Sequence, residues 1–210
     1  MYNPWEEIPL NDYENHMKLN SVMQLQAMNE RMKDQFNIYP VSSVMILGIA
    51  GGNGLEHIKE HQFEHIYGVD VNPSYLQEVV RRYPSLTGVL ECLCINLIEE
   101  TAKLPKADLV IANLLVEYIG YNCFQKAVQH VNPKFVSCII QINGEAKWVS
   151  DSPYLHAFDG LESVHHQIEQ KALEETMGKI GYYKIKTLEQ YLPNGKKLVQ
   201  MDFKRASLVL

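Results

Sequence analysis

A group of glycines and one later aspartate are the residues of this 210-residue chain best placed to do chemistry. Gly51, Gly52 and Gly54 follow an apolar run that ends at Leu47, and Asp70 ends the next apolar run, 19 positions after Gly51. Glycines adopt backbone angles barred to other residues and let a ligand touch the main chain. A carboxylate at the end of the second strand can accept both hydroxyl hydrogens of a ribose. The spacing therefore predicts a strand, a glycine loop and a second strand around a nucleoside-bearing cofactor.

Two common phosphate-binding loops do not match these glycines. The dinucleotide fingerprint G-x-G-x-x-G requires a glycine three positions after Gly54, where this chain has His57. The phosphate loop that ends in Gly-Lys-Ser/Thr is also absent, because Leu55 and Glu56 follow Gly54. A pyrophosphate therefore fits this loop poorly.

The frame Gly48, Ala50, Gly52, Gly54 and Asp70 resembles the first two motifs of the class I S-adenosylmethionine-dependent methyltransferases. In that family an acid and three alternating glycines follow the first strand, and a second acid ends the second strand. Gly48 stands where the family has Asp or Glu, and Ala50 stands where it has its first glycine. The resemblance implies S-adenosylmethionine as the cofactor, with its methionine end held differently or more weakly than is usual.

The resemblance also implies a set of cofactor contacts at the carboxyl ends of the strands. Asn96 follows the third strand, where the family has an Asp or Asn whose oxygen accepts a hydrogen bond from the adenine amino group, and Leu97 would flank the ring. The alternative for Asn96 is an ordinary turn residue. The full set of candidate cofactor-binding residues is Gly48, Ala50, Gly51, Gly52, Gly54, Asp70, Val71, Asn96, Leu97 and Asn113.

Glu117 is the first candidate catalytic residue. Residues 108–117 are expected to form the fourth strand and the start of a helix, and ligands gather at the carboxyl ends of strands in doubly wound sheets. There the Glu117 carboxylate can accept the proton of an incoming nucleophile or bind a cationic substrate. The alternative is a glutamate at a helix N-terminus, favoured by the helix dipole.

An N-terminal helical cap is expected before the first strand. Apolar side chains recur about every 3.6 residues between residues 14 and 36, without glycine or proline, which predicts one helix or a helix pair. Trp5, Tyr13 and His16 bring aromatic and titratable groups to this segment. We interpret residues 1–40 as a cap over the active site, with Tyr13 and His16 as further candidate catalytic residues, and residues 41–210 as the cofactor-binding domain. The alternative is an inert N-terminal brace.

The remaining pattern predicts an α/β fold. Helices are expected over residues 54–60, 75–82 and 169–180, and strands over residues 88–93 and 135–142. Two strand-like runs, 182–192 and 197–204, flank an Asn-Gly turn signal and predict a hairpin. The resemblance implies a seven-stranded, mostly parallel, doubly wound sheet that ends in this antiparallel hairpin. Residues 145–160 are long for a connection and form a candidate substrate-binding insert.

Composition excludes several classes of protein. With a net charge of -6, the chain lacks the cationic excess that unspecific nucleic-acid binding requires. It shows no basic-then-apolar leader and no run near the length of about 18 apolar residues that a membrane span requires. Four cysteines without a CxxC pair are expected to be buried, reduced thiols, which fits a cytoplasmic protein. We therefore expect no nucleic-acid or membrane partner.

The sequence therefore predicts an S-adenosylmethionine-dependent methyltransferase that acts on a small-molecule acceptor. One alternative is a nicotinamide-dependent oxidoreductase, which His57 and the terminal hairpin disfavour. The other is a noncatalytic S-adenosylmethionine-binding protein, which the departures at Gly48 and Ala50 keep open. The acceptor and the oligomeric state do not follow from the sequence.

Overall fold

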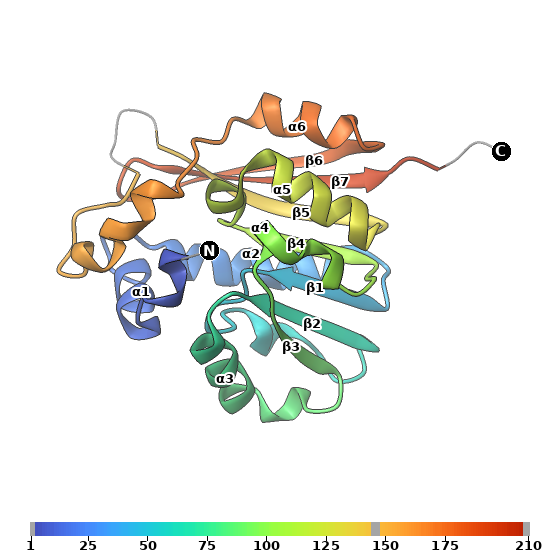
Figure 1. The fold of residues 1–210 in the computed structure, drawn as a ribbon, viewed down its shortest axis with the longest axis horizontal. Coiled ribbons are helices and arrows are strands. Elements are labelled where there is room, and N and C mark those ends of the chain that lie inside the picture. The colour runs from blue at the N-terminus through green and yellow to red at the C-terminus, as the bar shows by residue number, and fades with distance from the viewer. Residues whose placement is uncertain (1–2, 144–147, 208–210) are drawn as a thin grey trace.

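The computed structural model describes residues 3–143 and 148–207, and it contains one seven-stranded sheet (Figure 1). The strand order is β3-β2-β1-β4-β5-β7-β6, and β7 runs antiparallel to both of its neighbours. The strands are β1 (Ser43–Leu47), β2 (His65–Asp70), β3 (Leu90–Cys94), β4 (Leu109–Asn113), β5 (Phe135–Ile142), β6 (Tyr182–Tyr191) and β7 (Lys197–Arg205). The predicted fold class and its terminal hairpin are confirmed.

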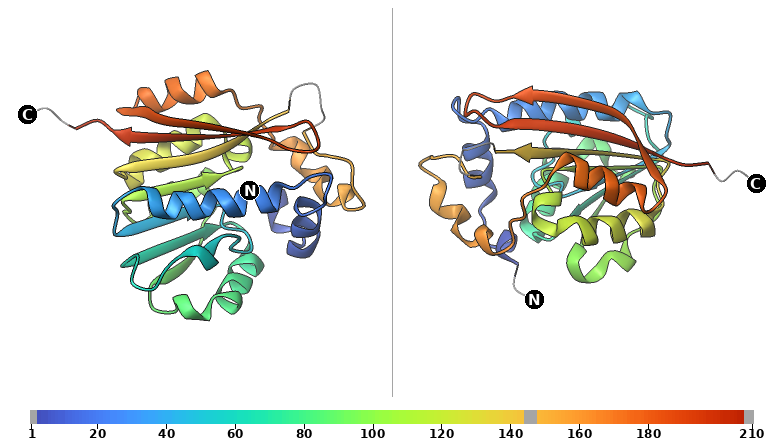
Figure 2. Two further views of the ribbon diagram at one scale, coloured as in Figure 1. Left: turned by 180° about the vertical axis from the view of Figure 1, so that it is seen from behind. Right: turned by 90° about the horizontal axis from the view of Figure 1, so that it is seen from above.

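Helices cover both faces of the sheet (Figure 2). The α-helices are α1 (Leu10–Met17), α2 (Gln24–Ile38), α3 (Pro73–Arg82), α4 (Leu97–Glu100), α5 (Val116–Val131) and α6 (Gln170–Gly178). Short 3-10 turns are η1 (Pro4–Glu6), η2 (Leu55–His57), η3 (Pro84–Leu86), η4 (Thr101–Lys103) and η5 (Leu155–Ser163). One core lies between the sheet and helices α2 and α3, and the other lies beneath α5 and α6.

Helix α2 packs on the sheet through a narrow apolar stripe. Met28, Met32 and Phe36 recur every four residues, which places them on one face of the helix, and all three are buried. Helix α2 lies across the middle of the sheet, as the left view of Figure 2 shows. The predicted helix pair is therefore present, but only its second member covers the sheet.

The first member of the pair, α1, lies beyond the carboxyl ends of the parallel strands, next to η5 (Figure 1). Ile8 packs there with Phe158 and Leu161 of η5 in a small buried cluster. Segments from the two halves of the chain therefore meet above the edge where the glycine loop and Asp70 lie.

The helix predicted over residues 54–60 is wrong. The chain makes only the single 3-10 turn η2, and His61 adopts a left-handed conformation (φ 58°). A Cβ atom added to Gly54 would lie 2.5 Å from Met32 Cβ, so α2 already occupies the space beside this loop. Tertiary packing by α2 therefore replaces the helix that usually follows a first strand.

The cysteine prediction is only partly right. All four cysteines are free, but Cys138 alone is buried, and Cys94 is exposed at the end of the edge strand β3. Within residues 3–143 and 148–207, no helix has the length and hydropathy that a membrane span requires.

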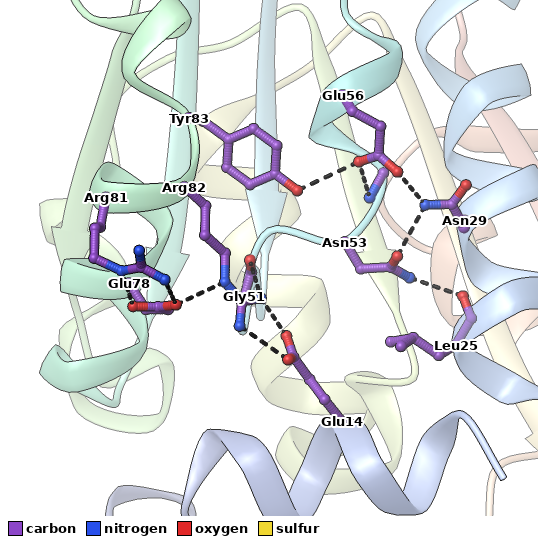
Figure 3. Close-up of polar contacts among 11 residues, drawn as sticks. Glu14, Leu25, Asn29, Gly51, Asn53, Glu56, Glu78, Arg81, Arg82 and Tyr83 are labelled. Atoms are coloured by element: carbon purple, nitrogen blue, oxygen red, sulfur yellow. Dashed lines mark hydrogen bonds and ion pairs between the residues drawn. The ribbon is translucent and has the colours of Figure 1, made fainter.

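Arg82 of α3 ties α1 to the glycine loop (Figure 3). Its Nη1 and Nη2 donate to the two carboxylate oxygens of Glu14 at 2.5 and 2.9 Å, and Nη1 also donates to the carbonyl oxygen of Gly51 at 3.1 Å. Its Nε donates to Glu78 on the same helix at 2.8 Å. A bidentate guanidinium–carboxylate pair fixes the relative orientation of the two side chains as well as their distance. Arg82 therefore holds the N-terminal segment, α3 and the loop in one arrangement.

Replacing Arg82 with Met should loosen α1 while the sheet stays folded. Charged hydrogen bonds contribute about 1.5–3 kcal/mol each, less where solvent reaches them, so we expect a loss of about 1–3 kcal/mol. Amide hydrogen exchange should become faster in α1 than in β1. The matched control is Arg81→Met, because Arg81 shares Glu78 but is 72% exposed against 28% for Arg82. Equal effects of the two substitutions would contradict the role of Arg82 in holding α1 against the glycine loop.

Candidate functional site

Two adjoining cavities open at the carboxyl edge of the sheet. The first, here called the Asp70 cavity, is lined by Asn3, Trp5, Tyr13, Gly48, Ala50, Val69, Asp70, Val71, Tyr75, Ile95, Asn96, Leu97, Ile98, Asn113, Leu114, Leu115, Tyr118, Ile119 and Val164. The second, here called the Glu117 cavity, is lined by Trp5, Tyr13, His16, Met17, Gln24, Leu114, Glu117, Tyr118, Gln141, Trp148, Val149, Phe158, His165 and Lys196. They share Trp5, Tyr13, Leu114 and Tyr118.

Asp70 lies at the end of β2 and faces the first cavity. Its Oδ2 accepts a hydrogen bond from the backbone N–H of Ala50 at 2.9 Å, and its Oδ1 accepts one from Asn72 N–H at 3.0 Å. Burial raises the pKa of Asp70 to about 6, against the effect of these bonds. The backbone of Val71 also hydrogen-bonds the carboxylate. A carboxylate has about four acceptor sites, so Asp70 can still accept a hydroxyl hydrogen.

The glycine loop needs its left-handed residues for different reasons. Gly48 (φ 70°) begins the turn, and a Cβ there would lie 3.1 Å from Leu115 Cδ1. Ala50 (φ 47°) takes the same unfavourable region with a side chain, which costs roughly 1–2 kcal/mol. A Cβ on Gly52 would meet the Tyr83 ring at 2.7 Å. Gly52 and Gly54 thus pack against Tyr83 and α2 and do not line the Asp70 cavity, whereas Gly48 and Ala50 do.

Two charged side chains lie close to Gly51. A Cβ there would lie 2.2 Å from Glu14 Oε1 and 2.6 Å from Arg82 Nη1. Glu14 also lines a third cavity, between the loop and helices α1 and α2. Where the resembled family has an acid at the position of Gly48, this chain brings a carboxylate to the loop from the N-terminal segment, which sequence reasoning missed.

The other predicted cofactor residues gather around the Asp70 cavity with their polar groups partly occupied. Asn96 caps α4, since its Oδ1 accepts a hydrogen bond from Ile98 N–H at 3.1 Å. This oxygen therefore has the structural role expected of an ordinary turn residue. The Asn96 Nδ2 forms no hydrogen bond with a described residue and is free to donate. Val71 and Leu97 supply apolar wall on either side.

Asn113 lines the cavity, but its side chain is bound to Gln35 of α2. Nδ2 of Asn113 donates to Gln35 Oε1 at 2.8 Å, and Gln35 Nε2 donates back to Asn113 Oδ1 at 3.0 Å. Gln35 is completely buried and also donates to Ser137 Oγ at 2.8 Å. The side-chain amide of Asn113 is therefore held toward α2, and sequence reasoning gave no signal for Gln35.

Glu117 lies in the first turn of α5 and is 4% exposed. The helix kinks at Gly120 (φ 69°, ψ 168°), and the Glu117 carbonyl oxygen accepts from His166 N–H at 2.6 Å. The carboxylate Oε1 accepts from the backbone N–H of Gln141 at 2.6 Å, whereas Oε2 is buried and has no hydrogen-bond partner among the residues that the structure describes. Burial raises the pKa of Glu117 to about 7. A helix-dipole role alone does not explain a buried carboxylate with one unsatisfied oxygen.

Tyr13 and His16 project from α1 into the same region. His16 is buried, its Nδ1 lies 2.8 Å from Ser152 Oγ, and burial lowers its pKa to about 4, so the ring is neutral at pH 7. Burial raises the pKa of Tyr13 well above its usual value, so its hydroxyl keeps its proton. All three candidate catalytic residues therefore line the Glu117 cavity.

Lys196 is a site residue that sequence reasoning missed. It follows the hairpin turn, is 2% exposed, and its Nζ donates to the Trp148 carbonyl oxygen at 2.6 Å. Because β6 runs parallel to β5, the turn after β6 lies at the carboxyl edge of the sheet. The predicted strand topology was therefore the signal that could have placed Lys196 near the site. Of the predicted insert, Trp148 and Phe158 line this cavity, and residues 144–147 lie outside the described part of the chain.

Comparison with known proteins gives similarity in structure alone. No family model matches the sequence, and no curated protein matches it. The solved structure of the cyclase SpnF superposes with a TM-score of 0.65 at 8% identity, over 88% of this chain and 82% of that one. The methyltransferase domain of a bacterial Hen1 protein gives 0.62 at 18% identity, over 95% and 100% of the two chains.

Magnesium protoporphyrin IX methyltransferase from Synechocystis PCC 6803, solved with bound S-adenosylmethionine, gives a TM-score of 0.60 at 12% identity, over 97% of this chain and 90% of that one. At these identities the likeness establishes the fold. It agrees with the seven-stranded sheet and its antiparallel terminal hairpin. The chain therefore has the Rossmann-like fold of the class I S-adenosylmethionine-dependent methyltransferases.

Proposed function

We propose that this protein transfers a methyl group from S-adenosylmethionine to a small-molecule acceptor bound in the Glu117 cavity. The observation that carries the proposal is the contact between the two cavities. One offers a buried carboxylate at the end of β2, and the other offers a buried carboxylate with an unsatisfied oxygen, and four residues form part of both walls. A cofactor in the first cavity would thus face an acceptor in the second.

The residues of the Asp70 cavity fit the cofactor. Asp70 retains acceptor capacity for the ribose, the Nδ2 of Asn96 can donate to an adenine ring nitrogen, and Gly48 leaves room where a side chain would meet Leu115. Solved neighbours of this fold hold S-adenosylmethionine or S-adenosylhomocysteine, which supports the same cofactor here. The comparisons offer no support for the nicotinamide alternative.

When bound, the cofactor supplies an electrophilic methyl group, so the protein mainly has to position the acceptor and exclude water. Orientation of two reactants is worth about 7–11 kcal/mol of barrier. Methylation of an N–H or O–H group releases one proton as the new bond to carbon forms and the methyl–sulfur bond breaks. Oε2 of Glu117 is the acceptor for that proton, because a pKa of about 7 suits a base at neutral pH.

Tyr13 and His16 act from the N-terminal segment, which we propose closes the site. Neutral His16 can accept or donate a hydrogen bond, and the Tyr13 hydroxyl can donate, so both can orient an acceptor without adding charge. Residues 4–17 form part of the wall of both cavities through Trp5 and Tyr13, and His16 adds to the wall of the Glu117 cavity. Closing segments commonly exclude water and complete a site.

Cofactor binding should depend on the charge of Asp70. Ribose hydroxyls donate to the ionised carboxylate, so the affinity for S-adenosylhomocysteine should fall as pH drops through about 6, where Asp70 takes up a proton. Asp70→Ala should weaken binding roughly ten- to a hundredfold and remove this pH dependence. Calorimetry from pH 5 to 8 measures both effects, with the exposed Asp34→Ala as control. Unchanged affinity in folded Asp70→Ala protein would take Asp70 out of the site.

Methyl transfer itself can be tested without knowing the acceptor. The protein is incubated with methyl-labelled S-adenosylmethionine and a fractionated metabolite extract, and labelled products are identified by mass spectrometry. Glu117→Gln should lower product formation by about a hundred- to ten-thousandfold, the usual contribution of one general base, and leave cofactor affinity within a few-fold. Glu60→Gln, at an 87% exposed side chain, is the control. If no fraction yields label although the cofactor binds, the catalytic proposal fails.

The raised pKa of Glu117 also predicts how stability depends on pH. The unfolded carboxyl ionises near 4.5, whereas the folded one stays protonated up to about 7, so the folded state loses stability as pH rises between these values. Glu117→Gln removes this pH-dependent loss of stability. As pH rises from 4.5 to 8, the free energy of unfolding of the variant should therefore increase relative to that of the wild type by up to about 3 kcal/mol. Urea unfolding at both pH values measures the gain. A difference that does not change with pH would mean that Glu117 ionises normally.

A further inference from the structure

The Glu117 cavity contains one buried acidic group and one buried basic group that are not paired with each other. Glu117 is 4% exposed and Lys196 is 2% exposed, and both line the cavity. Among the described residues, neither takes part in an ion pair within 4.0 Å. A buried charge without a partner is costly, so each group is expected to find one in a bound molecule.

Lys196 marks the positive end of the cavity. Its ammonium has three hydrogens, and one of them is donated to the Trp148 carbonyl oxygen. His16 and His165 line the cavity with it, and its charge is among the causes that lower the pKa of both rings, so neither adds a positive charge near pH 7. Burial lowers the pKa of Lys196 to about 8, which still leaves most of it charged at neutral pH. This end therefore offers one cation with two hydrogens that form no hydrogen bond to a described residue.

Glu117 marks the other end. Its Oε1 accepts from Gln141 N–H, and its Oε2 is a buried acceptor to which no described residue donates. Gln141 is itself occupied elsewhere, because its side-chain amide donates to Asn143 Oδ1 at 2.6 Å and to the Trp148 carbonyl oxygen at 3.0 Å. The missing donor must therefore come from outside this set of residues.

Aromatic rings line the space around these two ends. The rings of Trp5 and Tyr118 meet edge to face with centroids 4.8 Å apart, and the rings of Trp148 and His165 stack at 4.4 Å with an interplanar angle of 22°. Tyr118 and His165 join the two pairs at 5.9 Å. Such a continuous aromatic wall suits a flat ring, which can stack on one member or meet another edge-on.

We propose that the acceptor is a small aromatic acid, with an amino or hydroxyl group that donates to Glu117 Oε2 and a carboxylate that is held by Lys196 Nζ. This identity rests on the proposed function, because the group that meets Glu117 is the one that becomes methylated. The acceptor loses the proton of that group to Glu117 and gains the methyl carbon, while its carboxylate is unchanged. A purely cationic amine fits less well, because Lys196 would repel it.

The proposal is tested by the binding of simple ring compounds to the full-length protein saturated with S-adenosylhomocysteine. The probes are 2-, 3- and 4-aminobenzoate, which vary the span between the two polar groups, and aniline and benzoate, which each lack one of them. At least one aminobenzoate should bind tenfold or more tightly than aniline and benzoate by saturation-transfer NMR and calorimetry. Lys196→Met should reduce that affinity to the level of aniline, and the adjacent Lys197→Met should leave it unchanged, because Lys197 pairs with Glu189.

The outcomes separate this proposal from the function on which it rests. S-adenosylhomocysteine binding is measured alone first, and its absence would contradict the proposed function whatever the probes do. If the cofactor product binds but no aminobenzoate exceeds aniline and benzoate, the aromatic-acid acceptor is overturned and methyl transfer stands. Should Lys196→Met fail to fold, the comparison of probes on the wild-type protein decides alone. Equal loss of affinity in Lys196→Met and Lys197→Met would also overturn it.

Discussion

The parallel pairing of β1 with β2 and β4 is the constraint on which the site depends. Leu47 at the end of β1 pairs with Val69 and with Ala112, so the glycine loop, Asp70 and Asn113 all emerge at one edge of the sheet. The loop is hydrogen-bonded directly to β2, because the N–H groups of Gly48 and Ile49 both donate to the Val69 carbonyl oxygen, at 2.8 and 3.1 Å. Because these central strands are buried on both faces, a shift of register would expose apolar surface, and the edge stays fixed.

A buried polar network supports that edge from the side of α2. Ser137 of β5 donates to Asp202 of β7 at 2.5 Å, and Tyr39 donates to the other oxygen of Asp202 at 2.8 Å. Gln35 links this pair of strands to Asn113 at the end of β4. These buried hydrogen bonds favour one arrangement, because breaking any of them leaves a polar group unpaired in a low-dielectric interior. The orientation of α2 over the sheet is therefore coupled to the floor of the Asp70 cavity.

The fold followed from the sequence because its signals are local: apolar runs that end in Gly or Asp, and two strand-like runs around Asn194-Gly195. The errors come from tertiary contacts. The expected helix after Gly54 gives way to Met32 of α2, and Cys94 is exposed because β3 is an edge strand. The burial of Lys196 could not be predicted, because a lysine beside a turn is usually solvated. Its Nζ donates to the carbonyl oxygen of Trp148, nearly fifty positions earlier in the chain.

The two cavities draw on different parts of the molecule, and this explains what each kind of comparison can reveal. Most of the Asp70 cavity comes from strand ends and their loops, so any chain with this sheet places similar backbone there. The Glu117 cavity is walled largely by α1, η5, the turn after β6 and the residues that follow β5, which lie outside the central parallel strands. Neighbours that are 8–18% identical share the sheet and therefore report on the fold. The side chains that we propose select an acceptor, Lys196 and Trp148 among them, belong to this chain, and only its own contacts can support that assignment.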